Sequence, residues 1–178
     1  MRLHSSLRRG FGRALVMTFI AALPAQAEKA PNFILDRVEG GRMKLAEVLG
    51  EGPVLLNFWA TWCKPCKKEI PHLVALQKEF GDRGFTVVGI SLDDKNSMSR
   101  VKPTVKKLKV NYPVVLDPTK SYAKRVGAST LPTNVILNKE GEVVERVIGF
   151  RPGMEKELRA QVLKLIGEPA SEGEAAAH

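Results

Sequence analysis

Two kinds of hydrophobic pattern alternate along the chain, and together they predict strands that alternate with helices. Short, nearly continuous apolar runs are typical of strands covered on both faces, whereas apolar residues at intervals of three and four are typical of amphipathic helices. The predicted strands are 53–60, 85–92, 112–116, 134–138 and 142–150, the last two joined as a hairpin at 139–141. The predicted helices are 63–80, 96–109, 119–127 and 153–167, the last with Leu158, Val162, Leu165 and Ile166 facing inward.

The segment before the first buried strand has a weaker pattern. It predicts a short hairpin around Gly40 and Gly41, followed by a brief helix through Leu45 and Leu49. The whole order of elements predicts an α/β fold, in which a central mixed β-sheet is flanked by helices on both faces and extended by an N-terminal β-hairpin.

Residues 1–27 follow the pattern of a secretory signal peptide. Arginines without acidic residues precede the apolar run 14–23, and Ala25 and Ala27 form a signal-peptidase pattern. Ten helical residues rise only about 15 Å, roughly half of a bilayer core, so a membrane anchor is the weaker alternative. Residues 7–13 also partly resemble a twin-arginine signal. We therefore expect export, a single domain over residues 28–167, and a disordered tail over residues 168–178, where apolar periodicity ends.

The charge of the chain gives little support to a nucleic-acid partner. Lys and Arg number 28 and Asp and Glu 19, which gives a formal net charge of +9. Four of the arginines belong to the predicted signal peptide, and no basic run is interleaved with aromatic residues. We expect no nucleic acid among the partners.

The two cysteines of the chain lie in the stretch NFWATWCKPCKKEIP, residues 57–71. Cys63 precedes a predicted helix, whose free N–H groups and dipole stabilise a thiolate, and nearby lysines add positive potential. Cys66 lies one turn further on and can resolve a mixed disulfide. Pro65 suits a first helical turn, where its missing N–H would have no partner. The spacing predicts a redox pair.

Other uses of the pair are weaker. A static disulfide would close a very small loop and stabilise little. Zinc needs three or four protein ligands, and the histidine nearest in sequence is His72. Haem attachment would need a histidine at position 67, which is Lys67. We expect no metal and no bound cofactor, because the Cys63–Cys66 disulfide itself would carry the electrons.

The stretch 57–71, together with STLPTNVILNKEGEVV, resembles the TlpA/ResA-like branch of the thioredoxin superfamily over about residues 31–166. The resemblance implies a thioredoxin fold and an exported thiol–disulfide oxidoreductase. It also implies client proteins with disulfides, of the kind found in cytochrome c or copper-oxidase maturation, and a membrane protein that donates electrons. A monomer is favoured.

The resemblance also assigns roles to residues. It implies that Cys63 is the nucleophile, that Cys66 is the resolving thiol, and that Pro132 is a cis-proline facing them and positioning the substrate. Trp62 matches the tryptophan beside the active site. The residues expected to contact the substrate are Trp62, Lys64, Pro65 and Leu131.

Two positions depart from thioredoxin itself. The buried aspartate of thioredoxin falls on Asn57, and the lysine beside it falls on Gly89. Because Asn57 cannot ionise, another group must take the proton of Cys66. Glu69, three residues after Cys66 on the same helical face, matches the active-site glutamate of this branch. The alternative for Glu69 is a solvated helix residue paired with a lysine.

The direction of electron flow follows from the resemblance, which implies a reductase. The lysines near Cys63 favour the opposite direction, since they stabilise the reduced form. Two further alternatives remain: a non-catalytic binding module, such as a holdase or a copper-transfer partner, and a thiol peroxidase. The peroxidase would need Thr or Ser three residues before its cysteine, where the chain has Ala60.

Overall fold

The computed structural model describes residues 27–167 of the chain. The predicted signal peptide, up to residue 26, and the predicted tail, residues 168–178, lie outside the described residues. Within the described part, no helix combines the length and the apolar character needed to cross a membrane.

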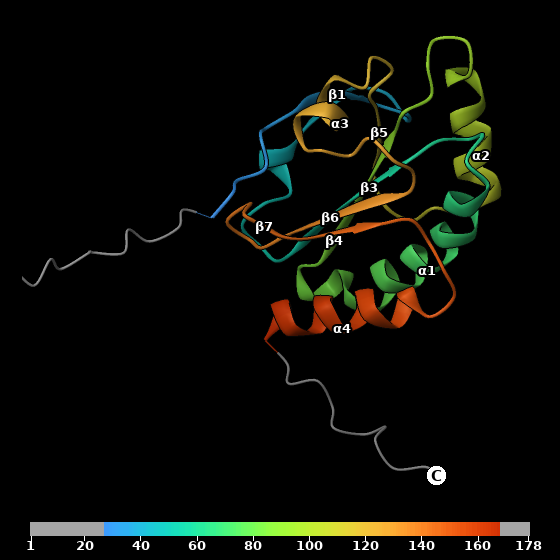
Figure 1. The fold of residues 1–178 in the computed structure, drawn as a ribbon. Coiled ribbons are helices and arrows are strands. Elements are labelled where there is room, and N and C mark those ends of the chain that lie inside the picture. Colours follow the sequence, from blue (N-terminus) through green and yellow to red (C-terminus); the bar gives the residue numbers. More distant parts are fainter. Residues whose placement is uncertain (1–26, 168–178) are drawn as a thin grey trace, which may run out of the picture.

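Seven strands form one mixed sheet (Figure 1). They span Ile34–Arg37 (β1), Arg42–Lys44 (β2), Val54–Trp59 (β3), Thr86–Ser91 (β4), Val114–Leu116 (β5), Thr133–Leu137 (β6) and Val143–Ile148 (β7). Their order in the sheet is β2-β1-β5-β4-β3-β6-β7. The central strands β3, β4 and β5 are parallel, whereas β6 and β7 are antiparallel to their neighbours. The hairpin β1–β2 pairs with β5, so it extends the sheet instead of standing apart.

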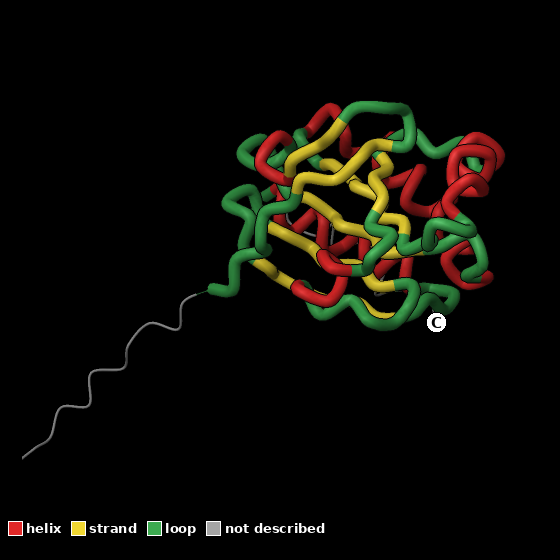
Figure 2. Tube along the Cα trace, turned by 90° about the horizontal axis from the view of Figure 1, so that it is seen from above, coloured by secondary structure: helices red, strands yellow, loops and turns green. Residues whose placement is uncertain are grey.

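Helices cover both faces of this sheet. They span Lys64–Phe80 (α1), Val101–Lys107 (α2), Ser121–Arg125 (α3) and Met154–Ile166 (α4). Figure 1 shows α1 and α4 below the sheet and α3 above it. Viewed from above in Figure 2, the strands run through the middle of the molecule with helices around them.

Alternating side chains of β3 enter two separate hydrophobic cores. Leu55 and Trp59 pack in the core that α1, α2 and α4 cover, whereas Leu56 and Phe58 pack in the core that contains α3 and the N-terminal hairpin. Successive side chains of a strand point to opposite faces. Asn57 therefore lies on the face that α1 covers.

The predicted elements are present, and the differences concern helix boundaries. The helix predicted over 96–109 is a 3₁₀ turn, Met98–Arg100, followed by α2. Its start is delayed because the Asp94 carboxylate accepts the amide N–H groups of Asn96 and Ser97 and holds a turn there. The helix predicted through Leu45 and Leu49 is shorter, a single 3₁₀ turn over Leu45–Glu47.

The buried face of α4 also differs slightly from the prediction. Leu158 and Val162 are buried as predicted, but Leu165 and Ile166 are only half-buried. Met154 and Leu163 are buried in addition.

Candidate active site

The two cysteines form a disulfide at the start of α1. Their Cα atoms lie 5.4 Å apart. Cys63 is the N-cap residue, and its Sγ accepts the amide N–H of Cys66 at 3.2 Å. Cys66 is fully buried, whereas 5% of Cys63 is exposed. Cys63 is therefore the less buried cysteine of the pair.

Asp93 holds the loop that leads into the disulfide. Its carboxylate is fully buried at the end of β4. It accepts the backbone N–H of Thr61 at 2.9 Å, the Thr61 hydroxyl at 2.6 Å and the Ser91 hydroxyl at 2.9 Å. These bonds attach the residues before Cys63 to the neighbouring strand. Asp93 therefore fixes the loop against the end of β4, and the conformation of Trp62 and Cys63 is set largely by β3 and β4.

The loop before β6 reaches the same region. The Leu131–Pro132 bond is cis, as the resemblance implied, and Pro132 is buried. Leu131 and Trp62 line a common hollow of about 160 Å³, although 58% of Trp62 is exposed. Lys120 and Lys124 also line it. The fold thus brings the neighbours of Cys63 and of Pro132 together beside one surface hollow.

The other two residues expected to contact the substrate, Lys64 and Pro65, are exposed on the first turn of α1. They do not line the hollow.

Glu69 lies on the buried face of α1 and is fully inaccessible to solvent. Its Oε1 accepts a hydrogen bond from Asn134 Nδ2 at 2.7 Å, and its Oε2 accepts one from Asn57 Nδ2 at 2.9 Å. Asn57 Nδ2 also donates to Asn134 Oδ1 at 2.8 Å. The alternative of a solvated helix glutamate is therefore wrong.

Burial determines how readily Glu69 holds a proton. Desolvation raises the pKa of Glu69 from its ordinary value of 4.5 to about 7, although the bonds from Asn134 and Asn57 act in the opposite direction. A carboxyl with a pKa near neutrality can both accept and release a proton under physiological conditions. Because Glu69 follows Cys66 by one helical turn, its position suits proton exchange with that thiol.

Tyr112 borders this buried group from the segment before β5. A side chain at Gly89 would lie 3.3 Å from the Tyr112 ring and 3.3 Å from Trp59 Nε1. The missing side chain therefore leaves room for the tyrosine, at the position where thioredoxin has a lysine. Desolvation, and then the charge of Glu69, raise the pKa of Tyr112, so this phenol is neutral.

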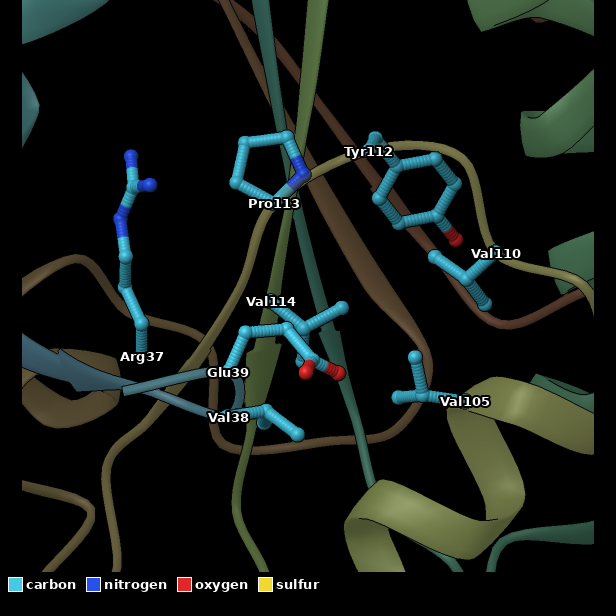
Figure 3. Close-up of a pocket in the computed structure, with 8 residues that line it drawn as sticks. All are labelled: Arg37, Val38, Glu39, Val105, Val110, Tyr112, Pro113 and Val114. Atoms are coloured by element: carbon cyan, nitrogen blue, oxygen red, sulfur yellow. The ribbon is translucent and has the colours of Figure 1, made fainter. Parts of the chain in front are cut away.

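Tyr112 also lines a second hollow, of about 130 Å³, beside the N-terminal hairpin. Figure 3 shows Tyr112 and Pro113 at one end of it and Val38 and Glu39 at the other.

Sequence reasoning did not assign roles to Asn134, Asp93 or Tyr112. Asn57 gave a signal, because this polar residue interrupts the apolar run 54–59, but Asn134 gave none, since it only begins the strand predicted over 134–138. A buried polar group needs a partner, so Asn57 indicated a polar contact without showing with which residue. The sequence did not show which strands are neighbours, and so the contact could not be derived.

The described residues contain no cluster of three or more His, Cys, Asp or Glu side chains that could hold a metal ion. The chemical groups that the described site does contain are its two cysteines and its buried carboxyl.

Comparison with known proteins places this geometry in a family. Residues 27–146 match the AhpC/TSA family. The chain is 39% identical to Thiol-disulfide oxidoreductase ResA of Bacillus subtilis (strain 168) over 125 residues, which are 70% of this chain and 68% of that protein. The chain belongs to the AhpC/TSA family and to the ResA-like thiol–disulfide oxidoreductases.

Two further similar proteins agree with this family assignment. Thiol-disulfide oxidoreductase ResA of Halalkalibacterium halodurans is 31% identical over 145 residues, 82% of this chain and 79% of that protein. A crystal structure of a thioredoxin-family thiol:disulfide interchange protein from Chlorobium tepidum TLS superimposes with a TM-score of 0.70 at 28% identity, and covers 82% of this chain and 100% of that one. The predicted thioredoxin fold and the predicted enzyme class are confirmed, whereas the roles of individual residues stay predictions.

Proposed function

We propose that this ResA-like protein is exported and reduces disulfides in selected client proteins. The observation that carries the proposal is the Cys63–Cys66 disulfide at the N-terminus of α1, with Cys63 slightly exposed, Cys66 fully buried, and the buried Glu69 one turn beyond Cys66. The helix N-terminus favours a thiolate at Cys63, and the thiolate is the attacking species in disulfide exchange.

The reaction balances within the protein and its client. The Cys63 thiolate attacks one sulfur of the client disulfide, forms a mixed disulfide and releases the first client thiolate. Cys66 then loses its proton to Glu69 and attacks Cys63 Sγ, which forms the Cys63–Cys66 bond and releases the second client thiolate. Two electrons pass to the client, and a dithiol of an electron-donor protein in the membrane must return them.

Residues around the cysteines supply the contacts with the client. Pro132 would support the client chain beside the disulfide, and Trp62 and Leu131 would hold a side chain at the hollow that they share. Lys64 and Pro65, exposed beside Cys63, would meet the same chain. The proposed clients are exported proteins with cysteine pairs that must be reduced before haem or copper is inserted.

The N-terminal sequence supports export. Residues 1–27 combine a basic segment, an apolar run and a small-residue cleavage pattern. An extracytoplasmic compartment is oxidising, so disulfides form there by default. A client that needs free thiols there therefore requires a dedicated reductase.

The exchange mechanism is tested with Cys66→Ala in the native host. Without the resolving thiol, Cys63 should remain joined to exported clients in mixed disulfides that a reducing agent releases. The double variant Cys63→Ala/Cys66→Ala is the control and should capture none. If Cys66→Ala also captures none, the exchange mechanism is wrong.

The direction of electron flow is tested separately by the reduction potential and by the redox state in cells. A value near that of thioredoxin, roughly −270 mV, with a reduced pool supports a reductase, whereas a value near roughly −120 mV with an oxidised pool reverses the direction. A non-catalytic copper-transfer or holdase role would instead leave Cys63→Ser active, or give stoichiometric copper binding by the reduced protein.

A further inference from the structure

The contact between Asn57, Glu69 and Asn134 joins three elements at a place where no solvent reaches. Asn57 lies on β3, Asn134 on β6 and Glu69 on α1, and each of the three is fully buried. Asn57 and Asn134 face each other in the antiparallel register of β3 and β6. The two carboxamides therefore form one unit, called the amide clamp below, directly under the carboxyl group.

We propose that Asn57 and Asn134 are positioning residues, which hold the Glu69 carboxyl for proton exchange with Cys66 and set the balance between its charged and neutral forms. The inference rests on the proposed function and deepens it. It assigns to two uncharged residues the control of a proton that the disulfide exchange must move.

The geometry of the amide clamp matches the charged carboxyl. Each amide nitrogen donates to a different oxygen, at 2.7 Å and 2.9 Å, so both oxygens act as acceptors. A protonated oxygen is a weaker acceptor, and its O–H needs an acceptor that the two N–H donors of the clamp cannot supply. Burial favours the neutral form by desolvation, while the clamp favours the charged form. Because the two effects oppose each other, the Glu69 carboxyl can both take up and release a proton.

Asn57 also has an unpaired acceptor oxygen that could serve the neutral form of Glu69. Its Oδ1 has no hydrogen-bond partner within the part of the chain that the structure describes. If the Asn57 carboxamide turned over, this oxygen could accept the O–H of a protonated Glu69. The bond from Asn57 Nδ2 to Asn134 Oδ1 would be lost at the same time, so the neutral form stays less well supported than the charged one.

Few titratable groups face Glu69. Tyr112, from the segment before β5, interacts with it, and desolvation raises the pKa of this phenol so that it stays neutral. Cys66 precedes it by one turn of α1, and in the disulfide neither cysteine titrates. The hydrogen bonds that act on Glu69 come from the clamp, so removing a clamp donor should act on Glu69 directly.

The proton step is the following. When Cys66 resolves the mixed disulfide, its S–H proton passes to the Glu69 carboxylate, and the resulting thiolate forms the bond to Cys63 Sγ while the client sulfur leaves as thiolate. When an incoming dithiol reduces the disulfide again, the proton returns from Glu69 to Cys66. The clamp stabilises the charged carboxylate that accepts the proton, while desolvation stabilises the protonated form that carries it until it is returned.

The test measures the protonation of the Glu69 carboxyl in the oxidised full-length domain, in the absence of any client. The side-chain carboxyl is followed by ¹³C NMR against pH, with Glu69→Gln to identify its signal. Asn134→Leu removes one donor without adding charge, and the midpoint should rise by about one pH unit or more, since a hydrogen bond to a charged group is lost. Asn134→Asp keeps the shape but adds a second carboxyl. The pair should then lose its protons in two steps, and the midpoint of the second step should lie above the Glu69 midpoint of the unchanged protein, because that step places two negative charges side by side.

Asn138→Asp is the matched control. Asn138 Nδ2 also donates to a carboxylate, Glu142 Oε2 at 2.8 Å, but at the β6–β7 turn. The same chemical change there should leave the Glu69 midpoint where it is in the unchanged protein.

A kinetic readout separates positioning from mere folding. The rate at which Cys66 resolves a preformed mixed disulfide is measured against pH, and its midpoint should move together with the NMR midpoint in the Asn134 variants. A folded Asn134→Asp or Asn134→Leu protein whose Glu69 midpoint equals that of Asn138→Asp overturns the inference. If the unchanged protein exchanges no disulfides but the NMR midpoint still moves, the proposed function fails while the tuning of Glu69 stands.

Discussion

At the scale of single residues, Glu69 is an ionisable group that the fold removes from water without giving it a cation. Its hydrogen bonds come from two neutral amides, and its pKa is raised to about 7 because desolvation outweighs those bonds. A raised pKa of an acid means that the folded state binds a proton more tightly than the unfolded chain does. The group therefore links stability to pH.

Glu69→Gln should change that pH dependence. Below about pH 4.5 Glu69 is neutral in both states, and as the pH rises to about 7 the unfolded chain loses its proton first. The folded state therefore loses roughly 3 kcal/mol over this interval, and the loss is complete above pH 7. The free energy of unfolding, from denaturant titration of the oxidised protein at pH 4.5 and pH 8, should fall less in Glu69→Gln by that amount. Equal slopes for both proteins would show that Glu69 has an ordinary pKa.

At the scale of elements, the connection between β3 and α1 presents the disulfide, and β4 holds this connection in place. The link is the carboxylate of Asp93, which accepts bonds from Thr61 and Ser91. A short loop between a buried strand and a helix has few contacts of its own. Its rigidity comes from the strand next to it, which lies about thirty residues further along the chain.

Asp93→Ala should therefore loosen the loop and destabilise the domain. Three buried donors lose their acceptor, and each unpaired donor costs about 1–3 kcal/mol, so a loss of about 3 kcal/mol or more is expected. Asp36→Ala is the control, because Asp36 makes only an exposed ion pair with Arg42 at 3.8 Å and should change stability by less than about 1 kcal/mol. Chemical denaturation compares the two. A similar small effect for both variants would contradict the role of Asp93.

At the scale of the whole molecule, the N-terminal hairpin is a structural part of the sheet. β1 pairs with β5, and Met43 of β2 is fully buried in the core that also contains Phe58 and Tyr122. The hairpin thus covers the side of the domain away from α1. The sheet has seven strands because this segment continues it beyond β5.

Met43→Ala should destabilise the domain even though the residue lies far from the cysteines in the sequence. Truncation of a fully buried methionine removes contacts and leaves a cavity, at a cost of about 2–5 kcal/mol. Ile34→Ala, on the facing strand of the same hairpin, is the control, since 47% of Ile34 is exposed and its loss should cost less than about 1 kcal/mol. Thermal unfolding measures both. A hairpin that merely rested on the sheet would give two small effects.

The sequence by itself determined the elements and the redox pair. Apolar runs and helical spacing are local properties, so the buried strands, the helices and the fold class could be predicted, with errors mainly at helix ends such as the turn that Asp94 holds. The spacing of Cys63 and Cys66 at a helix start is local as well. Glu69 was found because it shares a helical face with Cys66.

Only the tertiary structure decided what surrounds these residues. Asn57 and Asn134 are separated by 77 positions and Thr61 and Asp93 by 32, and these pairs meet because of the order of strands in the sheet. Burial, which raises the pKa of Glu69, is likewise a property of the packed whole. Local spacing thus identified the thiols and the carboxyl that we propose as their proton acceptor, but the acidity of that carboxyl depends on strand neighbours that no local pattern encodes.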